Sequence, residues 1–179
     1  MDATHRREML APAIVLVVGG SALATAWGFQ LIGGFIPCEL CLQQRVPYYI
    51  GLPIALAALL AAVAGAKPTA VRMLMMVAGL IFVFNVYLGV YHAGAEWAWW
   101  PGPADCGAGG AGPVGDVNDL LGQLDSIRIV SCTDATWRFL GLSFAGWNVV
   151  ASLVLVAVAF WGAFRRLAEP STVPARSEA

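Results

Sequence analysis

The sequence predicts an all-α membrane protein, a bundle of four transmembrane helices with one large loop outside the membrane. Of the 179 residues, 59% are hydrophobic and only 12% are charged, whereas soluble domains carry about 25% charged residues. The mean hydropathy is +0.74. A soluble core of this size cannot bury so much apolar surface, so we expect the lipid bilayer to surround the chain.

Four segments are long enough to cross a bilayer, which takes roughly 20 apolar residues. They cover about 10–33, 46–64, 70–92 and 142–164, and their apolar residues lie all round each helix. The loops at about 34–45 and 93–141 then lie on one side of the membrane. We expect residues 1–168 to form a single membrane domain and the polar residues 169–179 to be a disordered tail.

The second of these loops is also expected to contain a short helix. Apolar residues recur there at helical spacing, namely Val117, Leu120, Leu121, Leu124 and Ile127. Such a stripe favours a short amphipathic helix that rests on the membrane surface or on the bundle.

The distribution of charge predicts the orientation in the membrane. Basic residues gather before the first span, in the short turn between the second and third spans, and after the fourth: Arg6, Arg7, Lys67, Arg72, Arg165, Arg166 and Arg176. Most acidic residues lie on the other side. By the positive-inside rule, both termini are cytoplasmic and the two loops face outward. The net charge of −1 gives no reason to expect a nucleic-acid partner.

A cleaved signal peptide is the alternative for the N-terminus. Arg6-Arg7, an apolar run and Ala22-Leu23-Ala24 occur in the expected order. The hydrophobic stretch continues to Ile32, however, which is too long for a typical signal peptide. Cleavage would leave the cysteines on the same side of the membrane.

All four cysteines lie on the predicted outer side. Cys38 and Cys41 form a C-x-x-C motif at the membrane boundary, and Cys106 and Cys132 lie in the second loop. Close spacing of this kind suits a dithiol/disulfide couple. Pro47 is expected in the first turn of the second span, so the helix dipole and Arg45 would favour a thiolate at Cys41.

Several uses of these cysteines are open at this point. Four cysteines in an oxidising compartment allow three disulfide connectivities, of which the local pairs Cys38–Cys41 and Cys106–Cys132 are the simplest. The pairs could be inert staples, although a C-x-x-C staple constrains little of the chain. Zinc is disfavoured because Cys106 and Cys132 are not close-spaced, and covalent haem because Leu42 follows the motif instead of His. No metal is therefore expected.

A redox relay uses all four cysteines. The second loop could take electrons from a soluble dithiol protein and pass them to the C-x-x-C by thiol–disulfide exchange. At the bilayer surface, a lipid-soluble quinone is the natural two-electron acceptor. Arg45 could hydrogen-bond a quinone carbonyl and stabilise the Cys41 thiolate.

Cys38-x-x-Cys41-x-x-x-Arg45 after the first of four spans, with Cys106 and Cys132 in the second outer loop, resembles the DsbB family. This resemblance covers about 10–165 and implies a protein-disulfide oxidoreductase of the bacterial inner membrane, with periplasmic cysteines. Its partner would be a DsbA-like periplasmic thiol oxidase, and its cofactor ubiquinone or menaquinone. Cys41, Arg45 and His92 would form the quinone site, since the family has a histidine where His92 closes the third span.

The same resemblance implies the order of the relay. Reduced DsbA would attack Cys106, the released Cys132 would attack Cys38, and Cys41 would be left as the thiolate that faces the quinone.

Two alternative functions fit the sequence less well. A vitamin K epoxide reductase-like enzyme is disfavoured because its quinone-side C-x-x-C lies on the last helix of its bundle. A non-catalytic, disulfide-stapled scaffold or channel would be expected to carry ionisable residues within its spans. The four predicted spans are nearly free of such residues, which disfavours this alternative.

Overall fold

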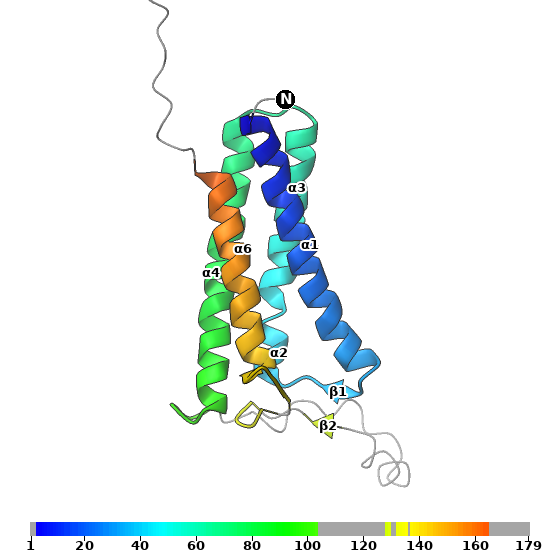
Figure 1. Cartoon of the computed structure of the whole chain (residues 1–179), viewed down its shortest axis with the longest axis vertical. Helices are drawn as coiled ribbons and strands as arrows, with labels where there is room; N and C mark the ends of the chain where they lie inside the picture. The colour runs from blue at the N-terminus through cyan, green and yellow to red at the C-terminus, as the bar shows by residue number, and fades with distance from the viewer. Residues whose placement is uncertain (1–2, 104–127, 130–131, 136, 165–179) are drawn as a thin grey trace, which may run out of the picture.

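The computed structural model describes residues 3–103, 128–129, 132–135 and 137–164. Four long helices form an up-and-down bundle (Figure 1): α1 (Ala3–Leu31), α3 (Val46–Val63), α4 (Pro68–Glu96) and α6 (Phe144–Ala163). In the described chain, four helices are long and apolar enough to cross a membrane. The predicted all-α, four-span fold class is therefore confirmed.

The helix bounds differ from the predicted spans mainly at α1 and α4. α1 begins at Ala3, well before the predicted start at about 10, and α4 extends to Glu96 rather than ending at about 92. The extra residues, about 3–9 in α1 and 93–96 in α4, include polar side chains and lie outside the most apolar stretch of each helix. A hydropathy window finds the apolar centre of a helix and not its last turns.

Short elements gather at the end of the bundle opposite the N-terminus (Figure 1). β1 (Phe35–Ile36) pairs in parallel with β2 (Arg128–Ile129), and α2 (Glu39–Gln43) follows β1. The segment around the C-x-x-C, predicted only as a loop, therefore contains a strand and a helical turn. The predicted amphipathic helix around 117–127 lies outside the described residues.

A β-hairpin precedes the last helix, where the sequence predicted the fourth span to begin. β3 (Arg138–Phe139) pairs antiparallel with β4 (Leu142–Ser143). The two residues between the strands, Leu140 and Gly141, have φ of +52° and +81°, the left-handed conformation of a tight type I′ hairpin turn. Ser143 then caps α6 because its hydroxyl accepts the Gly146 N–H at 3.2 Å.

The helices pack in the cyclic order α1, α3, α4, α6, so that α1 and α4 lie diagonally opposite. Their shared core is built from small residues around a few large ones: Ala11, Ala55, Ala58, Ala62, Ala78 and Ala159, with Met75, Phe82 and Leu155. Gly51 shows how tight this packing is, since a Cβ there would lie 2.8 Å from the Phe82 ring. Small residues allow membrane helices to approach closely.

Two polar contacts join helices across this core. Near the N-terminal end, Arg72 of α4 lies 3.2 Å from the buried Glu8 carboxylate of α1. Deeper in the bundle, Asn85 donates to the Ser152 hydroxyl at 2.8 Å, which links α4 to α6. Toward the other end, α1 diverges from α6 (Figure 1), and this is where the candidate site lies.

Candidate functional site

The C-x-x-C motif opens the short helix α2. Cys38 is the N-cap of this helix, and its sulfur accepts the Cys41 backbone N–H at 3.4 Å. The two sulfurs lie 3.0 Å apart, and both cysteines are free thiols. The structure therefore presents this pair as a dithiol, not as the disulfide that the sequence suggested.

The environment of Cys38 favours its thiolate. Its pKa is lowered from 9.0 to about 5, first by the hydrogen bond with the Cys41 side chain and then by His92, while burial opposes the shift. The sequence placed the relevant helix start near Pro47 and the thiolate at Cys41. In this dithiol form the helix start lies at Cys38 instead, and Cys38 is the thiolate at neutral pH.

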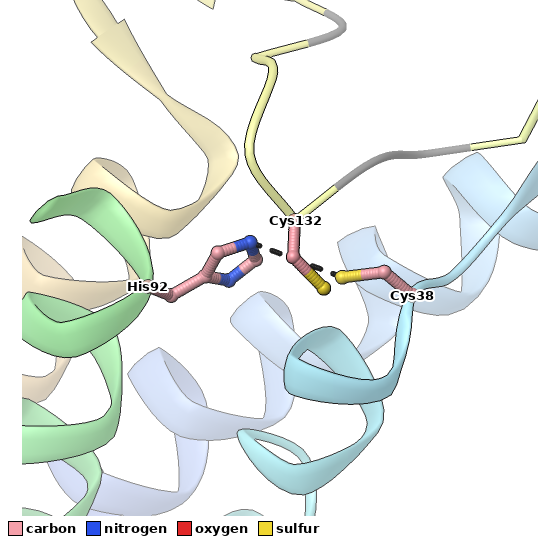
Figure 2. A group of neighbouring side chains, drawn as sticks. All are labelled: Cys38, His92 and Cys132. Atoms are coloured by element: carbon pink, nitrogen blue, oxygen red, sulfur yellow. Dashed lines mark hydrogen bonds between the residues drawn. The ribbon is translucent and has the colours of Figure 1, made fainter. Parts of the chain in front are cut away.

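Cys132 of the second loop lies beside this motif. Figure 2 shows Cys38, His92 and Cys132 pointing toward one another from three separate segments of the chain. Their sulfur and nitrogen atoms all lie within 4.8 Å of one another, and all three residues are buried. Cys132 is disulfide-bonded, whereas Cys106 lies outside the described residues. Cysteines 94 positions apart in the sequence are therefore neighbours.

The same three residues are of the kinds that bind zinc. A zinc site needs deprotonated thiolates as ligands. The Cys132 sulfur is engaged in a disulfide, so this form of the cluster offers one thiolate and one imidazole. The geometry matches thiol–disulfide exchange better, because that reaction requires a free thiolate close to a disulfide sulfur.

A cavity of about 520 Å³ lies next to Cys41, between α1, α6 and the β-hairpin. Its walls are mainly apolar, with an aromatic side formed by Phe29, Phe35, Trp137, Phe139, Phe144 and Trp147. Trp137 and Phe144 are stacked with their ring centroids 5.1 Å apart. Cavities of this size and character are typical of sites for small organic ligands.

Arg45 supplies the cationic group of this cavity and is held firmly. Its side chain is only 8% exposed, and Nη1 donates to the Gln30 amide oxygen at 2.5 Å. Nη2 donates to the Ala26 carbonyl at 3.4 Å, and the guanidinium lies over the Trp27 ring, 5.3 Å from its centroid. Arg45, Cys41 and His92, the three residues assigned to a quinone site in the sequence analysis, thus line one cavity.

These residues fit a quinone head group, which is a flat ring with two carbonyl acceptors. The aromatic side offers surfaces for stacking, and Arg45 offers a donor for a carbonyl beside the Cys41 thiol. Gln30 and Trp27 were not predicted. Gln30 differs from its surroundings in the sequence only in being an uncharged polar residue near the outer end of an apolar span.

His92 lies between the cysteines and a set of polar side chains. It is 2% exposed, and its Nε2 is 3.8 Å from the Cys38 sulfur and 3.8 Å from a Glu96 carboxylate oxygen. Its Nδ1 is 2.7 Å from the Gln44 amide nitrogen. Glu96 also accepts the Ser143 hydroxyl. Sequence reasoning missed Gln44 and Glu96, because neither carries a motif.

Comparison with known proteins gives a consistent match. The family model described as "Disulfide bond formation protein DsbB" matches residues 7–162. A protein of Saccharophagus degradans named "Disulfide bond formation protein B" is 27% identical over 86% of this chain and 92% of its own length. Proteins of the same name from Nitrosomonas europaea (27% identity; 83% and 90%) and Xanthomonas euvesicatoria (30%; 80% and 83%) are also similar.

No solved structure matches the chain. The family match extends from the first span to the last, and the four spans and the C-x-x-C after the first of them agree with the resemblance found in the sequence. This chain therefore belongs to the DsbB family of membrane proteins of disulfide bond formation.

Proposed function

We propose that this protein reoxidises a periplasmic DsbA-like dithiol protein and passes the two electrons through its cysteine pairs to a membrane quinone, ubiquinone or menaquinone. One observation carries this proposal above the others. The Cys38 sulfur lies 3.0 Å from the Cys41 sulfur and within 4.8 Å of the Cys132 sulfur. A single cysteine therefore contacts both pairs and can exchange disulfides with either.

The steps balance as ordinary thiol–disulfide exchange. A partner thiolate attacks Cys106, forms a mixed disulfide with it and releases Cys132 as a thiolate. Cys132 then attacks Cys38 of the oxidised C-x-x-C, so the Cys38–Cys132 bond forms and the Cys38–Cys41 bond breaks. Cys41 leaves with the electron pair as a thiolate that faces the cavity.

The chain then returns to its starting state. The second thiolate of the partner attacks the mixed disulfide, so the partner leaves as a disulfide and Cys106 is released as a thiolate. Cys106 then attacks Cys132, which re-forms the Cys106–Cys132 bond and releases Cys38 beside Cys41. The Cys38–Cys41 dithiol finally gives up two electrons and re-forms its disulfide. A quinone bound in the cavity would accept two electrons and two protons, which balances the oxidation of one partner dithiol.

Arg45 and the cavity walls have separate roles in this scheme. The Arg45 guanidinium stabilises negative charge on Cys41 and donates to an acceptor in the cavity, because its bonds to Gln30 and Ala26 fix its direction. The aromatic side keeps water from the reacting sulfur and orients a flat ring. His92 favours the thiolate of Cys38, since its Nε2 lies 3.8 Å from the Cys38 sulfur.

The proposed orientation puts the cysteine end of the bundle in the periplasm of a bacterial inner membrane. The N-terminus and the α3–α4 turn lie at the other end (Figure 1), where Arg6, Lys67 and Arg72 are found. This concentration of basic residues supports a cytoplasmic location for that end.

A turnover assay tests the proposal. Purified protein is mixed with a reduced thioredoxin-fold oxidase and a soluble quinone, and quinone absorbance is followed. Wild-type protein is expected to reduce one quinone per partner dithiol, and Cys41→Ser protein none. No turnover by the wild type, or equal turnover by both proteins, would refute the proposal.

A further inference from the structure

A chain of hydrogen bonds leads through the bundle to His92. The Tyr48 hydroxyl donates to the Asn148 amide oxygen at 2.7 Å, and the Asn148 amide nitrogen donates to the Gln44 amide oxygen at 2.6 Å. The Gln44 amide nitrogen then lies 2.7 Å from Nδ1 of His92. We call these four residues the amide chain. Tyr48 lies in α3, Asn148 in α6 and His92 in α4, and Gln44 lies between α2 and α3.

With the amide oxygens and nitrogens placed as they are in the structure, each bond in the amide chain has one direction. An amide oxygen accepts and an amide nitrogen donates, so the Asn148 oxygen accepts a hydrogen bond from the Tyr48 hydroxyl and the Gln44 nitrogen donates one to His92. Nδ1 of His92 is then an acceptor and carries no proton. A neutral imidazole has one N–H, which must be on Nε2, the atom that faces Cys38 and Glu96.

We propose that Gln44, oriented by Asn148 and Tyr48, is a positioning residue that holds the proton of the neutral His92 ring on Nε2, directed at Cys38. This deepens the proposed function, on which it rests for its role in the relay. In the dithiol form, the Nε2–H donates to the Cys38 thiolate and so favours the nucleophilic state of the thiol. With the proton on Nδ1, the Nε2 lone pair would face the thiolate.

A purely structural role is the competing explanation, since buried amides often only join helices. The two explanations differ in what they predict for the ring. If the amide chain only joins helices, its removal should lower stability and leave the protonation of His92 unchanged. If it positions the proton, its removal should change the nitrogen signals of His92.

Nitrogen NMR of the dithiol protein tests this directly. The chain contains two histidines, so ¹⁵N-histidine labelling in a His5→Ala background, without a histidine tag, leaves His92 as the sole signal. We expect a protonated Nε2 and an unprotonated, hydrogen-bonded Nδ1. Gln44→Met should remove the hydrogen bond from Nδ1, and Gln44→Glu should place a proton on Nδ1. The neighbouring Gln43 hydrogen-bonds the exposed Glu39, and Gln43→Met should change neither nitrogen signal of His92.

The reactivity of Cys38 gives a second readout that needs neither quinone nor partner. At about pH 5, Gln44→Met should slow alkylation of Cys38 by roughly two- to fivefold, because the variant weakens the hydrogen bond to the thiolate, whose complete loss would be worth about tenfold or more. If Gln44→Met does not fold, Asn148→Leu frees the same amide and should act in the same direction.

Two results would overturn the inference. One is a wild-type His92 with its proton on Nδ1, and the other is nitrogen signals that are identical in the wild type, Gln44→Met and Gln44→Glu. Failure of the proposed function would appear elsewhere, as absent quinone turnover with the His92 signals still as expected. The two failures are therefore distinguishable.

Discussion

The acidity of Cys38 is the property of the site that a simple substitution can test most sharply. The largest cause of its lowered pKa is the hydrogen bond with the Cys41 side chain. We compare Cys41→Ser, whose hydroxyl can still donate, with Cys41→Ala, which cannot. Both are made with Cys106 and Cys132 changed to alanine, so that Cys38 is the sole thiol and titrates alone.

The expected size of the effect follows from this contact. A hydrogen bond to a charged group contributes about 1.5–3 kcal/mol, which corresponds to roughly a ten- to hundredfold change in acidity. Cys41→Ala should therefore raise the pKa of Cys38 from about 5 part of the way toward 9. The rise is only partial because the His92 contact and the backbone N–H of residue 41 remain. Cys41→Ser should keep the pKa of Cys38 near the wild-type value, because the serine hydroxyl still donates a hydrogen bond.

The sign for stability follows from the same shift. The folded pKa lies below the ordinary value of 9.0, so the thiolate contributes stability at high pH. That contribution is lost as the pH falls from about 9 to about 5 and is absent below. The loss should be smaller in Cys41→Ala than in Cys41→Ser.

Thiolate absorbance and the rate of iodoacetamide alkylation, each measured against pH, give the titration midpoint. Cys38 of the serine variant should react at a nearly constant rate from about pH 6 upward. If the serine and alanine variants titrate together, the hydrogen bond with residue 41 does not control the acidity. If both titrate near 9, the reasoning about Cys38 as a helix N-cap thiolate is wrong.

Three further predictions concern the cavity and the bundle. Arg45→Met should raise KM for quinone by about tenfold or more, because it removes a charge-assisted donor, while Arg45→Lys should recover part of the loss; equal KM values in all three proteins would exclude Arg45 from the site. Arg72→Met leaves a buried carboxylate unpaired and should lower the free energy of unfolding by about 1–3 kcal/mol, measured by denaturation in detergent, with quinone turnover of the folded protein unchanged; unaltered stability would show that the ion pair contributes nothing. Gly94→Ala should destabilise, since its Cβ would lie 2.0 Å from the Trp100 ring, whereas Gly28→Ala, with no atom within 4 Å, should be neutral or stabilising by up to ~1 kcal/mol; the opposite order of melting temperatures would contradict this packing.

The sequence was sufficient to predict the fold class, because membrane helices are recognised by their length and apolar composition. It was also sufficient to predict that Cys41 and Arg45 lie near each other, since the two residues are only four positions apart in the chain. The C-x-x-C spacing favoured a redox function for Cys38 and Cys41. All of these signals are local in the chain.

What the sequence could not provide depends on packing between distant segments. The contact of Cys132 with Cys38 arises where β2 pairs with β1, and two-residue strands leave no periodic pattern. The amide chain through Asn148 and Gln44 joins positions 104 residues apart, which single-sequence reasoning cannot pair. Glu96 was assigned to a loop, because the apolar stretch ends before the helix does.

The assignment of the thiolate illustrates the same limit. The sequence located a helix start by its proline, Pro47, and so favoured Cys41. The structure has an additional helical turn that begins directly after Cys38, and one extra turn moves the favourable N-terminal position by several residues.

The proposed relay requires that the two cysteine pairs exchange disulfides through Cys38, and a cross-linking experiment measures this exchange. In protein with Cys41→Ala and Cys106→Ala, only Cys38 and Cys132 remain. After mild oxidation in membranes and proteolysis, mass spectrometry should find a Cys38–Cys132 disulfide in most molecules, formed within the monomer. Two free thiols under conditions that fully oxidise the Cys38–Cys41 pair of the wild type would contradict the account.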